Sequence, residues 1–173
     1  LKEKAKKWIK SLLLHCFRLE VRGEYHPDTN SVIIANRTSK IDLLLLAAFL
    51  PERLTVAIHP QAAGTLWMSV MGMFADLIEV DSTRAQAARA LIKAIKSGKR
   101  CVIFPQGISL QEESLRVYDG PALVLQKAGA SVIPVRIDGP QHSIFSISKD
   151  KHRTRLFPKV ILNILPTQRF TTD

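Results

Sequence analysis

The stretch SVIIANRTSKIDLLLLAAFL, residues 31–50, combines a short apolar run, a polar loop and a longer apolar run. The first run, SVIIA (31–35), is rich in β-branched residues and predicts a buried strand. The second, KIDLLLLAAFL (40–50), predicts a buried helix. Ser39 is the expected N-cap, and Asp42 follows at the capping-box spacing. On that structural interpretation, Asp42 is only a first-turn acid that the helix dipole favours.

Strand-like and helix-like segments alternate outward from this stretch. Strands are predicted at 53–58, 76–80, 101–104, 131–137 and 160–165, and helices at 64–74, 83–97 and 121–128. This alternation, with continuous apolar strands, predicts an α/β fold with a largely parallel sheet flanked by helices. Pro134 indicates that its strand lies at a sheet edge or has a bulge, because proline lacks the N–H that a ladder needs.

The opening segment, LKEKAKKWIKSLLLHCF (1–17), predicts an amphipathic helix. Its apolar positions fall at helical spacing and comprise Leu1, Ala5, Trp8, Ile9, Leu12, Leu13, Cys16 and Phe17. A lysine-framed apolar stripe with tryptophan is typical of a helix that lies on an anionic membrane. The alternative is a helix packed on the domain with a solvated lysine face. We therefore expect a membrane-surface helix at 1–17 and one domain at 18–173, excised from a longer chain.

Composition narrows the class of protein. The 173 residues suit one domain, and the formal net charge of +10 favours polyanionic partners. Only two cysteines are present, without metal-type or redox spacing, which argues against a disulfide scaffold, and the five histidines show no metal-ligand spacing. Few aromatic residues (6%) and no recognition-helix signature argue against a nucleic-acid binder. No segment has the ~20 apolar residues that span a bilayer.

Two further stretches follow predicted strands, where open α/β sheets place their ligand sites. FPQGIS (104–109) comes after one strand, and VIPVRIDG (132–139) contains another. Alone, the first is an ordinary turn and the second a plain core strand.

Together, in this order, the stretches resemble the glycerolipid (acylglycerophosphate) acyltransferase family. That family has an Asn-His-x4-Asp block after a first strand, a Phe-Pro-Glu-Gly block near the middle and a Val-Ile-Pro-Val strand. The matching stretches here are NRTSKID (36–42), FPQG (104–107) and VIPV (132–135). The resemblance covers about residues 17–166. RVYDGPALVLQKAGASVIPVRIDG and RLFPKVILNILP look closest to the acyltransferase domain of bacterial bifunctional lysophosphatidylethanolamine acyltransferase/acyl-carrier-protein synthetases.

The resemblance implies transfer of a fatty acyl group from an acyl-carrier-protein or coenzyme A thioester to a lysophospholipid hydroxyl. It implies no metal and no cofactor, a peripheral place on the cytoplasmic face of the inner membrane, and a fused adenylating (acyl-carrier-protein synthetase) domain. In this family the histidine is the general base, and the acid orients it. The positions that correspond to catalytic residues are Arg37 and Asp42. The substrate-binding positions are Asn36, Ser39, Arg84, Phe104, Pro105, Gln106 and Gly107.

Two positions depart from the family pattern. Arg37 stands where the family has histidine, and Gln106 stands where it has glutamate. A guanidinium stays protonated at any useful pH, so Arg37 cannot serve as a base. We expect Arg37 and Asp42 to form a salt bridge and turnover to be impaired. The alternative function is a non-catalytic lipid-binding or partner-binding module of the same fold.

Other features leave two interpretations open. Arg84 could meet an acceptor phosphate or be a solvated helix residue. The apolar segments LLLLAAFL and GTLWMSVMGMF could wall an acyl groove or be core helices, and the basic cluster 149–159 could contact headgroups, meet an acidic carrier protein or be a wet loop.

Overall fold

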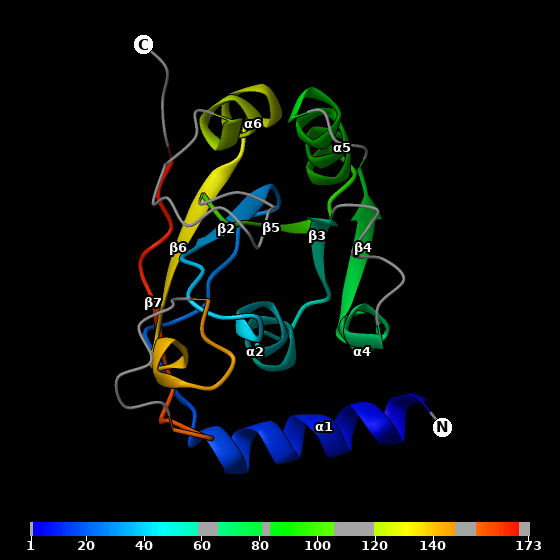
Figure 1. Ribbon diagram of the computed structural model, residues 1–173. Helices are drawn as coiled ribbons and strands as arrows, with labels where there is room; N and C mark the ends of the chain where they lie inside the picture. Colours follow the sequence, from blue (N-terminus) through cyan, green and yellow to red (C-terminus); the bar gives the residue numbers. More distant parts are fainter. Residues whose placement is uncertain (1, 59–65, 81–83, 106–119, 148–154, 170–173) are drawn as a thin grey trace.

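The computed structural model describes residues 2–58, 66–80, 84–105, 120–147 and 155–169 (Figure 1). The elements run in the order α1 (Lys2–Phe17), β1 (Glu20–Arg22), β2 (Ser31–Ala35), α2 (Asp42–Phe49), β3 (Leu54–Ile58), α4 (Leu66–Phe74), β4 (Ala75–Glu79), α5 (Arg84–Lys96), β5 (Arg100–Ile103), α6 (Gly120–Ala128), β6 (Ser131–Asp138), the 3-10 turn η1 (Pro140–His142) and β7 (Ile161–Ile164).

The strands form one seven-stranded sheet in the order β1-β7-β6-β2-β5-β3-β4. The neighbours from β6 to β4 are all parallel, as are β1 and β7, and among the described strands only β6 and β7 pair antiparallel. At its centre, β2 pairs with β6 from Ser31↔Ser131 to Ala35↔Val135. The predicted fold class, a largely parallel sheet flanked by helices, is confirmed.

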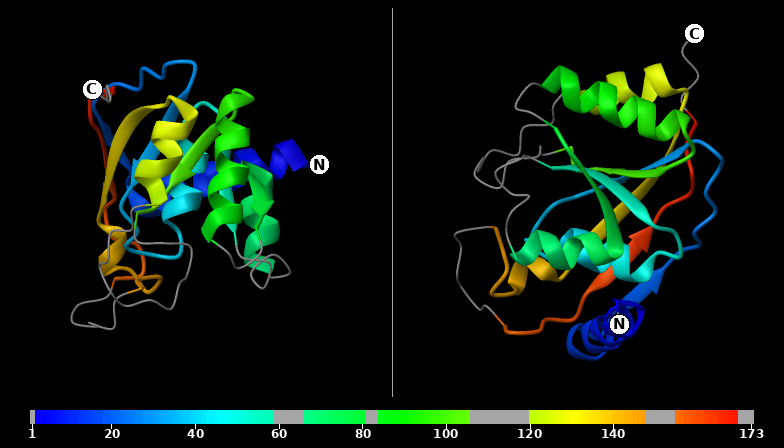
Figure 2. Two further views of the ribbon diagram at one scale, coloured as in Figure 1. Left: turned by 90° about the horizontal axis from the view of Figure 1, so that it is seen from above. Right: turned by 90° about the vertical axis from the view of Figure 1, so that its right-hand side faces the viewer.

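Helices cover both faces of the sheet, as Figures 1 and 2 show: α5 and α6 lie on one face, α2 and α4 on the other, and α1 lies beneath α2 and α4. Side chains alternate between two cores because successive strand residues point to opposite faces. In β2, Val32 belongs to the cluster under α5 and α6, whereas Ile33 belongs to the cluster with α1, α2 and α4. Strands buried on both sides explain why the sequence shows continuous apolar runs.

The stripe predicted for α1 divides between core and surface. Ile9, Leu13, Cys16 and Phe17 pack against the main core, and the Lys10 ammonium lies 5.9 Å from the centroid of the Phe49 ring. Trp8 and Leu12 point outward and are 79% and 63% exposed. The helix therefore packs on the domain and still presents large apolar side chains to the outside. No helix in the part of the chain that the structure describes is both long and apolar enough to cross a bilayer.

The sheet-edge prediction for Pro134 is wrong, because β6 lies between β7 and β2. The strand tolerates proline because its regular ladder with β7 begins only at Val135, opposite Ile164. The Pro134 carbonyl accepts from the Leu165 N–H (2.9 Å), just beyond the end of β7. The nitrogen of Pro134 faces the same side, so the N–H that proline lacks costs the β6–β7 ladder no hydrogen bond.

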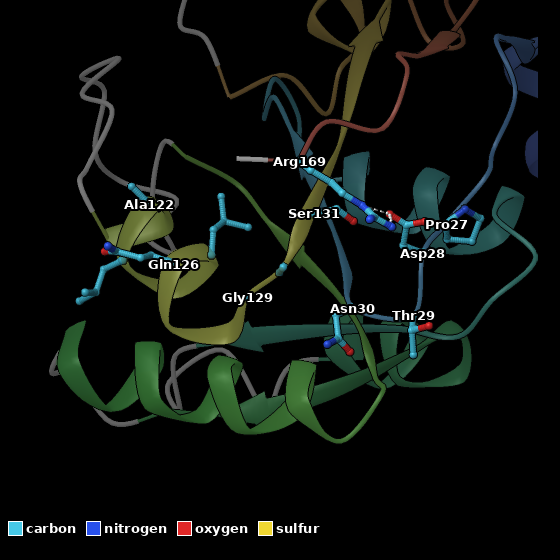
Figure 3. A pocket seen from close by; sticks show the side chains of 12 residues that line it. Pro27, Asp28, Thr29, Asn30, Ala122, Gln126, Gly129, Ser131 and Arg169 are labelled. Atoms are coloured by element: carbon cyan, nitrogen blue, oxygen red, sulfur yellow. Dashed lines mark hydrogen bonds and ion pairs between the residues drawn. The ribbon is translucent and has the colours of Figure 1, made fainter. Parts of the chain in front are cut away.

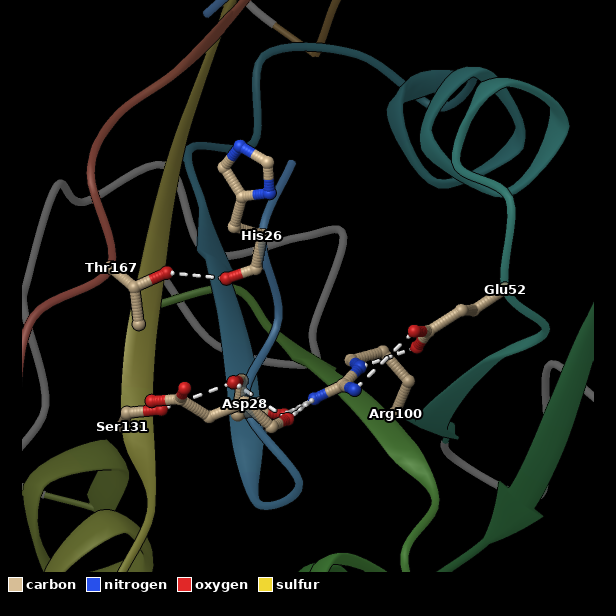
Figure 4. A network of polar contacts seen from close by, with 7 residues as sticks. His26, Asp28, Glu52, Arg100, Ser131 and Thr167 are labelled. Atoms are coloured by element: carbon tan, nitrogen blue, oxygen red, sulfur yellow. Dashed lines mark hydrogen bonds and ion pairs between the residues drawn. The ribbon is translucent and has the colours of Figure 1, made fainter. Parts of the chain in front are cut away.

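Arg100 ties together the amino ends of the central strands (Figure 4). Its guanidinium is buried, pairs with the Glu52 carboxylate and donates to the carbonyls of Asp28 (3.0 Å) and Ser31 (2.8 Å). Nearby, burial chiefly raises the pKa of Tyr25 to about 12. This network holds the sheet at the end opposite the carboxyl ends of its parallel strands.

Candidate functional site

The carboxyl ends of β2, β5 and β6 meet at one edge of the sheet, because these strands are parallel neighbours. The loop 36–41 leaves β2 there, Phe104 and Pro105 leave β5, and the turn 139–147 leaves β6. Segments far apart in the sequence are thus brought together, among them the NRTSKID loop and the first residues of the FPQGIS stretch. This edge is the candidate site.

Asn36 fastens the start of the loop to β6. Its side-chain amide donates to the Ile137 carbonyl (2.9 Å), and its side-chain oxygen accepts from the Ile137 N–H (2.7 Å). Both polar ends of the side chain are therefore engaged by backbone. The geometry shows that Asn36 positions the loop. Its substrate-binding role stays a prediction.

We expect Asn36→Ala to lower the free energy of unfolding by about 1–3 kcal/mol, because it leaves the partly buried Ile137 N–H and carbonyl without their partners. Urea unfolding followed by circular dichroism measures this. Asn30→Ala is the matched control, since Asn30 is exposed, and it should change stability by less than about 0.5 kcal/mol. Equal effects of the two changes would contradict the fastening role.

Asp42 is fully buried (0% exposed) at the first turn of α2. Its carboxylate accepts from the N–H groups of Thr38 (2.5 Å) and Ser39 (2.8 Å) and from both of their hydroxyls. Burial raises the pKa of Asp42, and the hydrogen bonds from Ser39 and Thr38 oppose that shift. These donors fill the roughly four acceptor positions of a carboxylate, so Asp42 folds the loop 38–42 around itself.

The predicted N-cap is wrong by two residues. The helix begins at Asp42, and its N-cap is Ile41, which makes no side-chain capping hydrogen bond. The Ser39 hydroxyl instead donates to Asp42 and accepts from the Ile41 N–H (3.3 Å). Only half of the expected capping box exists, namely the bond from the Ser39 N–H to the acid.

The predicted salt bridge between Arg37 and Asp42 is also wrong: these two described side chains make no ion pair, and Asp42 is satisfied by Thr38 and Ser39. Arg37 is half-buried, and its guanidinium carbon lies 5.6 Å from the centroid of the Phe104 ring. Burial lowers the pKa of Arg37, while the charge of Asp42 raises it. A guanidinium so placed remains a cation and cannot accept a proton from a substrate.

A second segment, the turn 139–147, completes the edge. Lys40 N–H donates to the Phe145 carbonyl and Ile147 N–H donates to the Thr38 carbonyl, both at 3.0 Å. The turn starts at Gly139, whose φ of 112° and close approach to the Lys159 carbonyl (2.0 Å from where a Cβ would stand) require glycine. The turn residues Asp138-Gly139-Pro140 are a sequence signal for this turn. Nothing in the local sequence indicates that the turn packs against the loop 36–41.

The remaining predicted site residues are only partly placed. Phe104 and Pro105 are half-buried at the end of β5. Arg84 begins α5, and its side chain, like Gln106 and Gly107, lies outside the described residues. Among the residues that the structure describes, no group of three or more histidine, cysteine, aspartate or glutamate residues is arranged to hold a metal ion.

A groove of about 1120 Å³ lies at the opposite edge of the sheet (Figure 3). Its lining includes Asn30, Gln126, Ser131 and an ion pair between Asp28 and Arg169 (3.0 Å). Because Asn30 and Ser131 stand at the amino ends of β2 and β6, this groove is separate from the candidate site.

Comparison with known proteins agrees with this arrangement. The solved structure of the 1-acyl-sn-glycerophosphate (LPA) acyltransferase PlsC from Thermotoga maritima is similar, with a TM-score of 0.66 and 21% identity over 100% of this chain and 75% of that one. At that identity the likeness shows the fold. The model of the acyltransferase family matches residues 18–138, more than half of the chain and a stretch that includes the loop 36–41, both ends of β5 and all of β6. This chain belongs to the acyltransferase family.

Proposed function

We propose that this chain has the acceptor site of a lysophospholipid O-acyltransferase, in which a fatty acyl group passes from an acyl-carrier-protein or coenzyme A thioester to a lysophospholipid hydroxyl. The observation that supports it best is the NRTSKID loop at the carboxyl end of β2, with Asp42 buried behind it and Phe104 of β5 beside position 37. The family match supports acyl transfer. The glycerolipid acceptor is inferred from the motif resemblance.

In this proposal, position 37 is where a base would take the proton of the acceptor hydroxyl. Loss of that proton makes the oxygen a nucleophile for the thioester carbonyl, and the thiol then leaves. Arg37 donates hydrogen bonds but cannot take the proton. The chain should therefore hold the parts of an acyl-transfer site and turn over only at a trace rate.

A second candidate function is a non-catalytic lipid-binding module of the same fold. It is favoured by the combination of a cation at position 37 and an Asp42 carboxylate already filled by Thr38 and Ser39. A guanidinium at the edge would suit the phosphate of a lysophospholipid. Binding of a lysophospholipid without any product, both in the chain as it stands and with histidine at 37, would favour this candidate.

We also propose that α1 places the domain on the anionic cytoplasmic surface of the inner membrane. Its exposed Trp8 and Leu12 stand among the exposed Lys4 and Lys7, and the whole chain has a formal net charge of +10. Apolar side chains framed by lysines bind a membrane by burial plus attraction to anionic lipid.

We expect Trp8→Ser/Leu12→Ser to weaken co-sedimentation with phosphatidylglycerol-containing vesicles by about tenfold or more, because the two most exposed large apolar groups of α1 are removed. Point changes are preferable to removing the helix, since Leu13 and Phe17 belong to the core. Val21→Ser is the control, because Val21 is also exposed (49%) but lies on β1. Equal pelleting of the two variants would refute the role of α1.

A further inference from the structure

An exposed isoleucine stands at the corner of a turn beside the candidate site. Ser146 N–H donates to the Ser143 carbonyl (3.0 Å), which closes a turn with Ile144 and Phe145 at its centre. Phe145 packs against the core, whereas Ile144 is 56% exposed. Turn corners usually have glycine, proline, asparagine, aspartate or serine, so an aliphatic residue there needs another explanation.

Two more exposed apolar residues lie next to this turn. A parallel bridge pairs Ser143 with Arg155, which sets Leu156 and Phe157 beside the turn. Leu156 is 56% and Phe157 40% exposed, and the Phe157 ring meets the Phe17 ring of α1 edge to face at 5.3 Å. In Figure 1 this segment lies beside the carboxyl end of α1, on the same side of the molecule.

Most of the large exposed apolar side chains lie on these three segments. Of the nine large apolar side chains exposed in the described residues, six lie on α1, on the turn or on the 155–157 segment. These six are Trp8, Leu12, Leu14, Ile144, Leu156 and Phe157. A patch rimmed by polar residues marks an interaction surface, whereas single exposed apolar residues do not.

Basic residues beside the turn indicate its partner. Arg155, within the segment, and Lys40, whose N–H bonds the turn, are both exposed, and α1 has the exposed Lys4 and Lys7 farther along the same side. An apolar centre with a cationic border matches the surface of an anionic bilayer, where aliphatic groups enter the acyl region and cations meet the phosphates.

We propose that Ile144, Leu156 and Phe157, which we call the turn patch, insert into an anionic membrane as a second contact beside α1. The backbone bonds from Lys40 to Phe145 and from Ile147 to Thr38 join this turn to the NRTSKID loop. Membrane contact at the turn patch therefore positions the NRTSKID loop at the lipid surface. This inference rests on the proposed function in one respect: the acceptor that reaches the loop is taken to be a membrane lipid.

The test compares two double variants of the full chain by vesicle co-sedimentation without acyl donor. Ile144→Asn/Leu156→Asn removes two patch residues, and Leu123→Asn/Leu165→Asn removes two apolar side chains of similar exposure, on α6 and just beyond β7. Asparagine suits a turn corner, so the first variant should fold, and circular dichroism checks both. Vesicles of phosphatidylglycerol mixed with phosphatidylcholine are used beside phosphatidylcholine alone.

We expect the patch variant to bind the anionic vesicles about tenfold or more weakly, the second variant to bind like the unaltered chain, and Ile144→Leu/Leu156→Ile to retain binding. Equal binding by all variants would overturn the proposal. So would a patch variant that keeps vesicle binding but loses self-association or carrier-protein binding, because the patch would then serve a protein partner. No acyl transfer is measured, so this result is independent of whether histidine at 37 restores turnover.

Discussion

Replacing Arg37 by histidine should raise the rate of lysophospholipid acylation by about 100- to 10,000-fold, the usual contribution of a positioned general base. The loop that holds position 37 is fixed by Asn36 at one end and Asp42 at the other. Imidazole is smaller than the guanidinium it replaces, so it fits the space beside Phe104. Acylation by the unaltered chain and the variant, measured with the same acyl thioester, gives the ratio.

Two controls separate base catalysis from the removal of a cation. Arg37→Ala takes away the guanidinium without supplying a base, so it should stay near the trace rate. The rate of Arg37→His should rise with pH through the imidazole pKa, near 6.5, because only the neutral ring accepts a proton. Equal gains in the alanine and histidine variants would show that Arg37 blocks the site and that no base acts there.

In the Arg37→His background, Asp42→Asn should cut turnover by about 100-fold and lower the free energy of unfolding by about 1–3 kcal/mol. The carboxylate is met only by donors from Thr38 and Ser39 among the described residues. An asparagine NH2 would face some of those donors as another donor, so the loop would lose part of its fixed shape. This differs from the expectation for a simple helix cap, where asparagine replaces aspartate with little change.

Asp76→Asn is the matched control for removing an acid. Asp76 pairs with Arg53 and Lys99 at the surface of β4, where an ion pair contributes about 0–1 kcal/mol. It should leave turnover unchanged. If Asp42→Asn destabilised the protein but left the turnover of the folded fraction intact, Asp42 would serve the fold alone.

The alternation of strands and helices was predictable because burial on both faces forces continuous apolar runs in the sequence. SVIIA became β2 as predicted, and the helix expected at 40–50 became α2 at Asp42–Phe49. The meeting of the NRTSKID loop with Phe104 at the end of β5 was also predictable, since parallel strands end at the same edge. These features depend on local pattern and general topology.

Features that depend on distant partners were not predictable. β1 has three residues and exists because it pairs with β7, some 140 residues away. Just after β1, the chain comes so close to β7 that a Cβ on Gly23 would stand 2.0 Å from the Ile164 carbonyl oxygen. Asp42 had two kinds of partner available, the Arg37 cation and the nearby N–H groups, and the spacing suited both. The bend of the loop 36–41 buries the Asp42 carboxylate among the donors of Thr38 and Ser39. The linear order of residues does not encode this bend. The division of the α1 stripe likewise follows from where α2 and α4 lie.

We propose that this edge is an acyl-transfer site in which Arg37 and Gln106 stand in place of the base and the glutamate of the family pattern. The decisive measurement is the yield of acylated lysophospholipid from four chains: the present sequence, Arg37→His, Gln106→Glu and the double variant. We expect trace product from the present chain, little gain from Gln106→Glu alone, and the highest yield from the double variant, with histidine supplying most of the increase. A present chain that acylates as fast as the double variant would contradict it.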